Sequence, residues 1–127
     1  MKRFIWILAI LLSSCSSKQQ DYRKADDALD AGREYINAIL QGDFSKAAFY
    51  TLPDDKNKSI LEELEKNYRK KDKEGRQQLR TASININEVK EISSNSSQIY
   101  YSNSFDKESH ILSVIKQKDG WLVDLGK

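Results

Sequence analysis

The sequence is poor in the residue types that most often carry chemistry, with one cysteine and one histidine among 127 residues. A single cysteine cannot build a disulfide framework, and one histidine cannot complete a zinc site without carboxylate ligands. No glycine-rich phosphate loop, nucleophile elbow or HExxH motif occurs in the sequence. We therefore expect no cofactor, no metal and no catalytic residue set.

The sequence also lacks a hydrophobic run long enough to cross a membrane. Its longest run, Phe4 to Leu12, has nine residues, whereas a transmembrane helix needs about 20. Two cations, Lys2 and Arg3, precede this run and two small residues follow it. This order is typical of a cleaved secretory signal.

The residues that follow the apolar run, Leu12, Ser13 and Ser14, stand directly before Cys15. They resemble the lipobox of bacterial lipoproteins. The resemblance implies a signal peptide over residues 1–14 and a mature chain that begins at Cys15, with diacylglycerol on its sulfur. Such acyl chains would anchor the protein in the membrane of the cell envelope. Ser16 is not the aspartate that retains enterobacterial lipoproteins at the inner membrane, so the resemblance favours the outer membrane, facing the periplasm.

Charge gives no support for nucleic acid binding. Removal of the first 14 of 127 residues leaves 113, and the loss of Lys2 and Arg3 from 21 basic residues leaves 19 against 19 acidic ones. A balanced chain of this length predicts one domain and no nucleic acid partner. We expect a tether over residues 15–22 and the domain over residues 23–127.

Helical periodicity dominates the first part of the domain. Gly42 is suited to end the first helix, and Asp43 to cap the second. Ser59 and Glu62 have the spacing of a capping box. The predicted helices span residues 23–41, 44–50 and 59–73.

A run of cations, from Lys66 to Arg80, covers the second half of the third predicted helix and the residues that follow it. Acidic residues gather at the start of that helix and cations at its end, which is the arrangement that the helix dipole favours. We interpret the run as a solvated helix face. A patch for anionic lipid headgroups is the alternative.

After residue 80 the pattern changes to the alternation typical of strands. Val89 breaks the alternation and suggests a bulge, and Asp119-Gly120 indicates a tight hairpin. Trp121, Val123 and Leu125 are expected to face the core. The predicted strands span residues 84–92, 98–105, 108–118 and 121–125.

Helices followed by an antiparallel meander predict an α+β fold, with two to three helices packed on a curved four-stranded sheet. Residues 35–39, 41–47 and 119–125 resemble the cone-shaped nuclear transport factor two-like superfamily, also called ketosteroid-isomerase-like or cystatin-like. The chain is similar to small lipoproteins of unknown function with this fold from Bacteroidetes. The resemblance implies a pocket between the sheet and the helices.

Three aromatic residues, Tyr35, Tyr101 and Trp121, are the candidates for lining that pocket. Asp124 is the carboxylate considered for catalysis, but alternation places it on the face opposite to Trp121 and Val123. His110 has no partner that the sequence names, and we interpret it as a surface or strand-edge residue.

We therefore predict a monomeric, non-catalytic module that binds a small ligand or another envelope protein. The alternative is a small-molecule isomerase or hydrolase that uses a carboxylate in the cone pocket.

Overall fold

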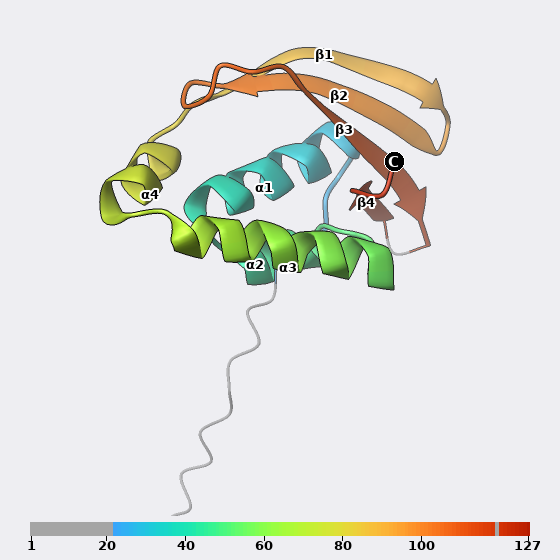
Figure 1. Ribbon diagram of the computed structural model, residues 1–127. Helices are drawn as coiled ribbons and strands as arrows, with labels where there is room; N and C mark the ends of the chain where they lie inside the picture. Colours follow the sequence, from blue (N-terminus) through green and yellow to red (C-terminus); the bar gives the residue numbers. More distant parts are fainter. Residues whose placement is uncertain (1–21, 119) are drawn as a thin grey trace, which may run out of the picture.

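The computed structural model describes residues 22–118 and 120–127, which form four helices followed by four strands (Figure 1). The helices are α1 (Ala28–Gln41), α2 (Phe44–Phe49), α3 (Asp55–Lys70) and α4 (Lys73–Arg80). The strands are β1 (Ile84–Ser93), β2 (Ser96–Asn103), β3 (His110–Gln117) and β4 (Gly120–Asp124). This order confirms the predicted α+β class, with α4 as an additional helix.

The strands form one antiparallel sheet in the order β1-β2-β3-β4, which curves over α1. Figure 1 shows α1 directly beneath the sheet, with α2 and α3 on the other side of α1. Helix α1 therefore lies in the core, and its buried side chains meet Ile99, Val114 and Val123 of the sheet, each fully buried. Burial of each such aliphatic side chain contributes about 1.5–3 kcal/mol.

Helix α1 begins five residues later than the periodicity predicts. The Asp27 side chain accepts a hydrogen bond from the Asp30 N–H at 2.8 Å and so caps the helix. The predicted end is confirmed, because Gly42 adopts the left-handed conformation, with φ of 72°. The Asp43 cap of α2 is also confirmed, since its carboxylate accepts from the Lys46 N–H.

The predicted capping box of the third helix is wrong. Asp54, directly after Pro53, accepts from the Asn57 N–H at 2.8 Å, so α3 begins at Asp55 and Ser59 lies inside it. At the other end, Lys71 has an extended backbone and Asp72 caps α4. The cation-rich run is therefore divided between two helices.

The bulge in β1 lies at a different place from the one expected. The pairing with β2 shifts between Ile86 and Glu88, whereas Val89 pairs regularly with Ile99. The extra residue, Asn87, turns Val89 to the same face of the sheet as Ile86. The break in alternation seen in the sequence therefore originates two residues before Val89.

The end of the chain closes the core against the helices. Val123, fully buried in β4, donates to the Tyr50 carbonyl oxygen at 2.7 Å and accepts from the Leu52 N–H at 2.9 Å. Trp121 and Leu125 are only half-buried. No helix among the described residues is long and apolar enough to span a membrane.

Candidate functional site

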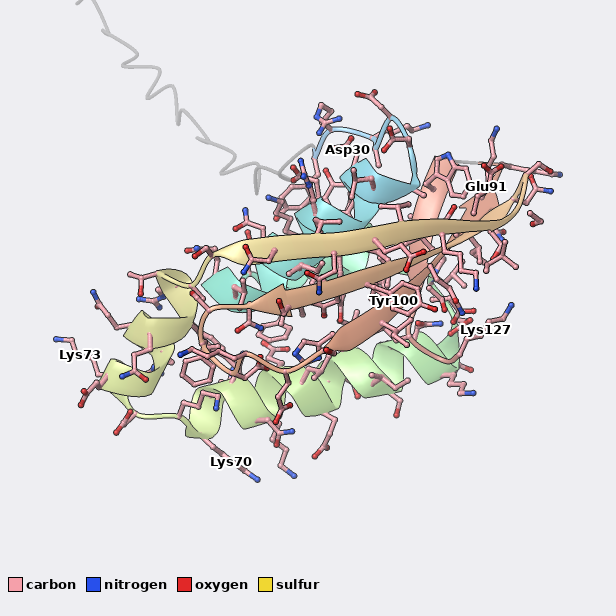
Figure 2. The ribbon with its side chains drawn as sticks, turned by 90° about the horizontal axis from the view of Figure 1, so that it is seen from above. Asp30, Lys70, Lys73, Glu91, Tyr100 and Lys127 are labelled. Carbon is pink, nitrogen blue, oxygen red and sulfur yellow. The ribbon has the colours of Figure 1, made fainter. Side chains whose placement is uncertain are left out.

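A pocket of about 340 Å³ opens between α1, the end of α3 and the loop that joins β2 to β3. In both views the end of α3 and this loop lie at the same end of the molecule, where Figure 2 labels Lys70. Pockets of this size accommodate small organic molecules. Its lining is mostly apolar and includes Ile36, Ile39, Leu40, Phe44, Leu64 and Leu79.

Three tyrosines are the main polar groups of the inner wall, and they come from three different elements. Tyr35 lies on α1, Tyr68 on α3 and Tyr101 on β2. The Tyr68 hydroxyl is buried and has no hydrogen-bond partner among the described residues. The hydroxyls of Tyr35, a residue only 4% exposed, and of Tyr101 also have no hydrogen-bond partner within that part of the chain. Unlike the Tyr68 hydroxyl, these two are not closed off, so this wall offers two hydrogen-bond donors to an occupant of the pocket.

The hydroxyls of Tyr35 and Tyr101 keep their protons at neutral pH. Burial raises the pKa of Tyr35 above the usual tyrosine range, and the neighbouring Tyr101 raises it further. Burial, followed by the charge of Asp106, raises the pKa of Tyr101 to about 12. The wall is therefore neutral and presents donors to an incoming oxygen or nitrogen atom.

The mouth of the pocket carries a histidine and a carboxylate in contact. His110 Nε2 lies 2.9 Å from Asp106 Oδ2, and the His110 ring stacks on Tyr101 with centroids 5.1 Å apart. The sheet register explains the stacking, because His110 and Tyr101 are direct cross-strand partners. Asp106 is thus a partner that the sequence does not name for His110, the half-buried first residue of β3.

The loop before β3 is built to hold Asp106. The buried Asn103 side chain accepts from the N–H groups of Phe105 and Asp106, both at 3.0 Å, and so ends β2 two residues before the predicted position. Burial disfavours ionisation of Asp106, but hydrogen bonds from the Glu108 N–H and from His110 outweigh it and lower its pKa. Asp106 is therefore a carboxylate at neutral pH.

One group of potential metal ligands lies at this mouth. Asp106, Glu108 and His110 each bring a ligand atom within 4.8 Å of the others. Both carboxylates belong to exposed residues, and exposed acidic groups are common without an ion. The group has the nitrogen and oxygen donors that a divalent ion accepts, but Asp106 and His110 already satisfy one another.

The structure places two of the three predicted lining residues, Tyr35 and Tyr101, on the wall of this pocket. Trp121 lies elsewhere, in a second groove with Phe49 and Leu122. The register accounts for the separation, because Trp121 pairs with Lys116, six residues along β3 from His110. Alternation predicts the face of a strand but not the position along the sheet.

Asp124 also lies outside the pocket. Its Oδ1 accepts from Asn57 Nδ2 at 3.2 Å and from the Gly126 N–H at 3.0 Å. This residue is thus engaged in joining β4 to α3. The carboxylate that lines the pocket is Asp106, which the sequence pattern did not single out because its partner approaches through the turn before β3. Cys15 and its lipobox residues Leu12, Ser13 and Ser14 lie outside the described residues.

Comparison with known proteins supports the fold. The chain is similar to a solved structure described as an NTF-2 like protein of unknown function from Shewanella oneidensis MR-1. The two share 17% sequence identity over 77% of this chain and 92% of the other, with a TM-score of 0.55. No protein-family model and no curated protein matches the chain. The chain thus has the nuclear transport factor two-like fold, and the similar structure is itself described as a protein of unknown function.

Proposed function

We propose that this nuclear transport factor two-like domain binds a small ligand in its cone pocket without transforming it. The observation that carries the proposal is the pair of hydroxyls of Tyr35 and Tyr101 on one pocket wall, for which the described residues provide no hydrogen-bond partner. A hydrogen bond contributes about 0.5–1.5 kcal/mol. A ligand that accepts hydrogen bonds from these two hydroxyls gains that contribution while its apolar part fills the rest of the pocket.

The lining indicates the chemistry of the ligand. A mostly apolar cavity with neutral donors suits a compact apolar molecule that carries a carbonyl or other acceptor oxygen. At the rim, Lys71 lies over the Phe105 ring at 5.6 Å from its centroid. Lys71 and His110 add polar contacts at the mouth for the end of the ligand that remains near water.

A panel of apolar compounds, with and without an acceptor oxygen, tests this proposal by calorimetry. Loss of one donor in Tyr35→Phe should weaken binding by about five- to tenfold, the effect of one hydrogen bond. Tyr100→Phe is the matched control, because Tyr100 lies on the other face of β2 and bonds to Gln98. Equal affinities in Tyr35→Phe and Tyr100→Phe would contradict the assigned site.

The signal and lipobox residues support a second part of the proposal, that Cys15 carries the lipid that holds the domain in the envelope. We expect the protein in the outer membrane fraction, facing the periplasm, with two or more acyl chains on its first residue by mass spectrometry. Cys15→Ala should release it from the membrane. Retention of Cys15→Ala at wild-type level would refute the anchor.

A catalytic role for the same pocket is the second candidate, favoured by the contact between His110 and Asp106. A carboxylate that orients a histidine beside neutral tyrosine donors can support proton transfer in an isomerase or hydrolase. Asp106→Asn should then reduce turnover while leaving ligand affinity within about twofold. If every compound that binds is recovered unchanged, binding alone remains. If none binds, contact with another protein through the outer sheet face becomes the working role.

A further inference from the structure

A second groove, of about 440 Å³, lies between the end of α2 and β4. Its walls are largely apolar and include Phe49, Pro53, Trp121 and Leu122, with Lys24 at the side. Phe49 is 39% exposed, which is high for a phenylalanine that packs against two other aromatic rings. We call these five residues the aromatic groove.

The aromatic groove lies where the described chain begins. The Tyr22 ring packs on Phe49 with centroids 5.4 Å apart, and Phe49 packs edge to face on Tyr50 at 4.9 Å. Only seven residue steps separate Tyr22 from Cys15, and an extended chain covers at most about 3.6 Å per step. A lipid on Cys15 therefore keeps Tyr22 within about 25 Å of the bilayer, however residues 16–21 run.

The segment before Tyr22 is a poor occupant for this groove. Residues 16–21 read Ser-Ser-Lys-Gln-Gln-Asp and contain no apolar side chain. Tryptophan, tyrosine and phenylalanine side chains favour the boundary between headgroups and acyl chains of a bilayer. The groove thus matches the lipid surface to which the predicted anchor confines it.

Charge at the groove does not favour anionic lipid. Lys24 is the cation in its wall, whereas Asp54 and Asp55 directly follow Pro53 in the sequence. One cation against two carboxylates gives no net attraction to anionic lipid, so aromatic burial rather than charge would drive contact. A bilayer of zwitterionic phosphatidylcholine is therefore sufficient as a partner.

We propose that the aromatic groove rests on the bilayer that holds Cys15, with Phe49 and Trp121 at the level of the lipid headgroups. The inference depends on the proposed anchor and not on ligand binding. Trp121 pairs with Lys116, and the pocket residue His110 lies six positions away on β3, a distance of about 20 Å along a strand. Docking by the groove therefore leaves the pocket mouth open to the surrounding compartment.

Fluorescence of Trp121 tests this orientation directly. The sequence contains two tryptophans, and Trp6 belongs to the predicted signal peptide, so Trp121 reports alone in the mature chain. Protein expressed from its full sequence is reconstituted in nanodiscs of phosphatidylcholine with brominated acyl chains, which quench tryptophan only at short range. We expect about twofold lower emission than in unbrominated nanodiscs, as for an interfacial tryptophan.

The control moves the reporter to the other side of the domain. The double variant Trp121→Phe, Tyr100→Trp places it on the outer face of the sheet, which faces the viewer in Figure 2, and should show no quenching. Phe49→Ser should reduce the quenching of Trp121, and Ile111→Ser, on the outer face and 60% exposed, should not. Equal quenching at both reporter positions overturns the docking. Failure to co-purify with nanodiscs overturns anchor and docking together.

Discussion

A single buried hydroxyl group tests how much an unpaired polar atom costs this fold. Tyr68 packs its ring against Gly42 and Phe44, yet its buried oxygen has no partner among the described residues. In a protein without ligand, Tyr68→Phe removes only a desolvated group. We therefore expect the free energy of unfolding to rise by about 1 kcal/mol, measured by urea denaturation.

The same substitution should leave ligand affinity unchanged, because the Tyr68 hydroxyl is closed off from the pocket. A loss of stability in the ligand-free protein would show that the Tyr68 hydroxyl has a partner in the folded protein.

Asn57 is a second residue whose environment is polar and buried. It is 1% exposed, its Nδ2 donates to Asp54 Oδ1 at 2.8 Å, and its Oδ1 accepts from the Leu125 N–H at 2.6 Å. Asn57→Ala leaves the Leu125 N–H without its acceptor and removes the side-chain donor to Asp54, which keeps only its bond from the backbone N–H of residue 57. We expect a loss of about 2–4 kcal/mol in the free energy of unfolding by urea denaturation, against a change within about 0.5 kcal/mol for the exposed Asn37→Ala.

At the scale of elements, the turn between α1 and α2 depends on a glycine for two separable reasons. Gly42 has φ of 72°, and a Cβ there would lie 2.4 Å from the Tyr68 ring. Gly120 has φ of 111°, but a Cβ at that position would meet no atom within 4 Å among the described residues, so it isolates the backbone effect. Gly120→Ala should cost about 1 kcal/mol in thermal or urea unfolding, and Gly42→Ala about 2–4 kcal/mol. Equal costs would indicate that the Tyr68 ring moves freely.

Helix ends that depend on a local sequence signal were predictable from the sequence. Helix starts at which two capping residues compete were not. Gly42 and Asp43 each act within a few residues, and the end of α1 and the start of α2 follow them. Two cap candidates compete at α3, and the tertiary contact of Asn57 with Leu125 favours Asp54 over Ser59. The Asp72 cap separates α4, which has no buried residue and only one large apolar side chain, that of Leu79.

In the candidate site, the face on which a residue lies was predictable from the sequence, but the contacts between distant elements were not. Alternation and helical periodicity assign Tyr35 and Tyr101 to inner faces, and the structure places both on the pocket wall. The contact between His110 and Asp106 and the approach of Tyr68 depend on how far each element extends along its neighbour. A single sequence does not contain that register, and this is why Trp121 was expected in the pocket.

At the scale of the whole molecule, stability should depend on acid through three carboxylates. The Arg23 guanidinium bonds to both Asp30 oxygens, at 2.7 and 2.9 Å, and holds the pKa of Asp30 below its usual value. The Asn57 N–H lowers the pKa of Asp54, and hydrogen bonds to Asp106 outweigh its burial and lower its pKa. Groups with a depressed folded pKa stabilise above their unfolded value and lose that effect as pH falls.

These three carboxylates should therefore make the free energy of unfolding independent of pH above about pH 5. Below about pH 4 the free energy of unfolding should decrease, because the carboxyl groups of the unfolded chain bind protons first. Urea denaturation at a series of pH values measures the slope. Asp30→Asn should make the slope shallower, because it removes the ion pair with Arg23. An unchanged slope would show that this ion pair does not contribute to folding.

The fold closes only with β4, the last of the four described strands. Val123 in β4 satisfies the backbone of Tyr50 and Leu52, and Leu125 satisfies the side chain of Asn57. A ribosome that adds about 5–20 residues per second needs roughly 4–15 s to proceed from Tyr50 to Val123. During that time the helices have no sheet edge to complete them, so a nascent chain stays open and exposed to chaperones until β4 has been synthesised.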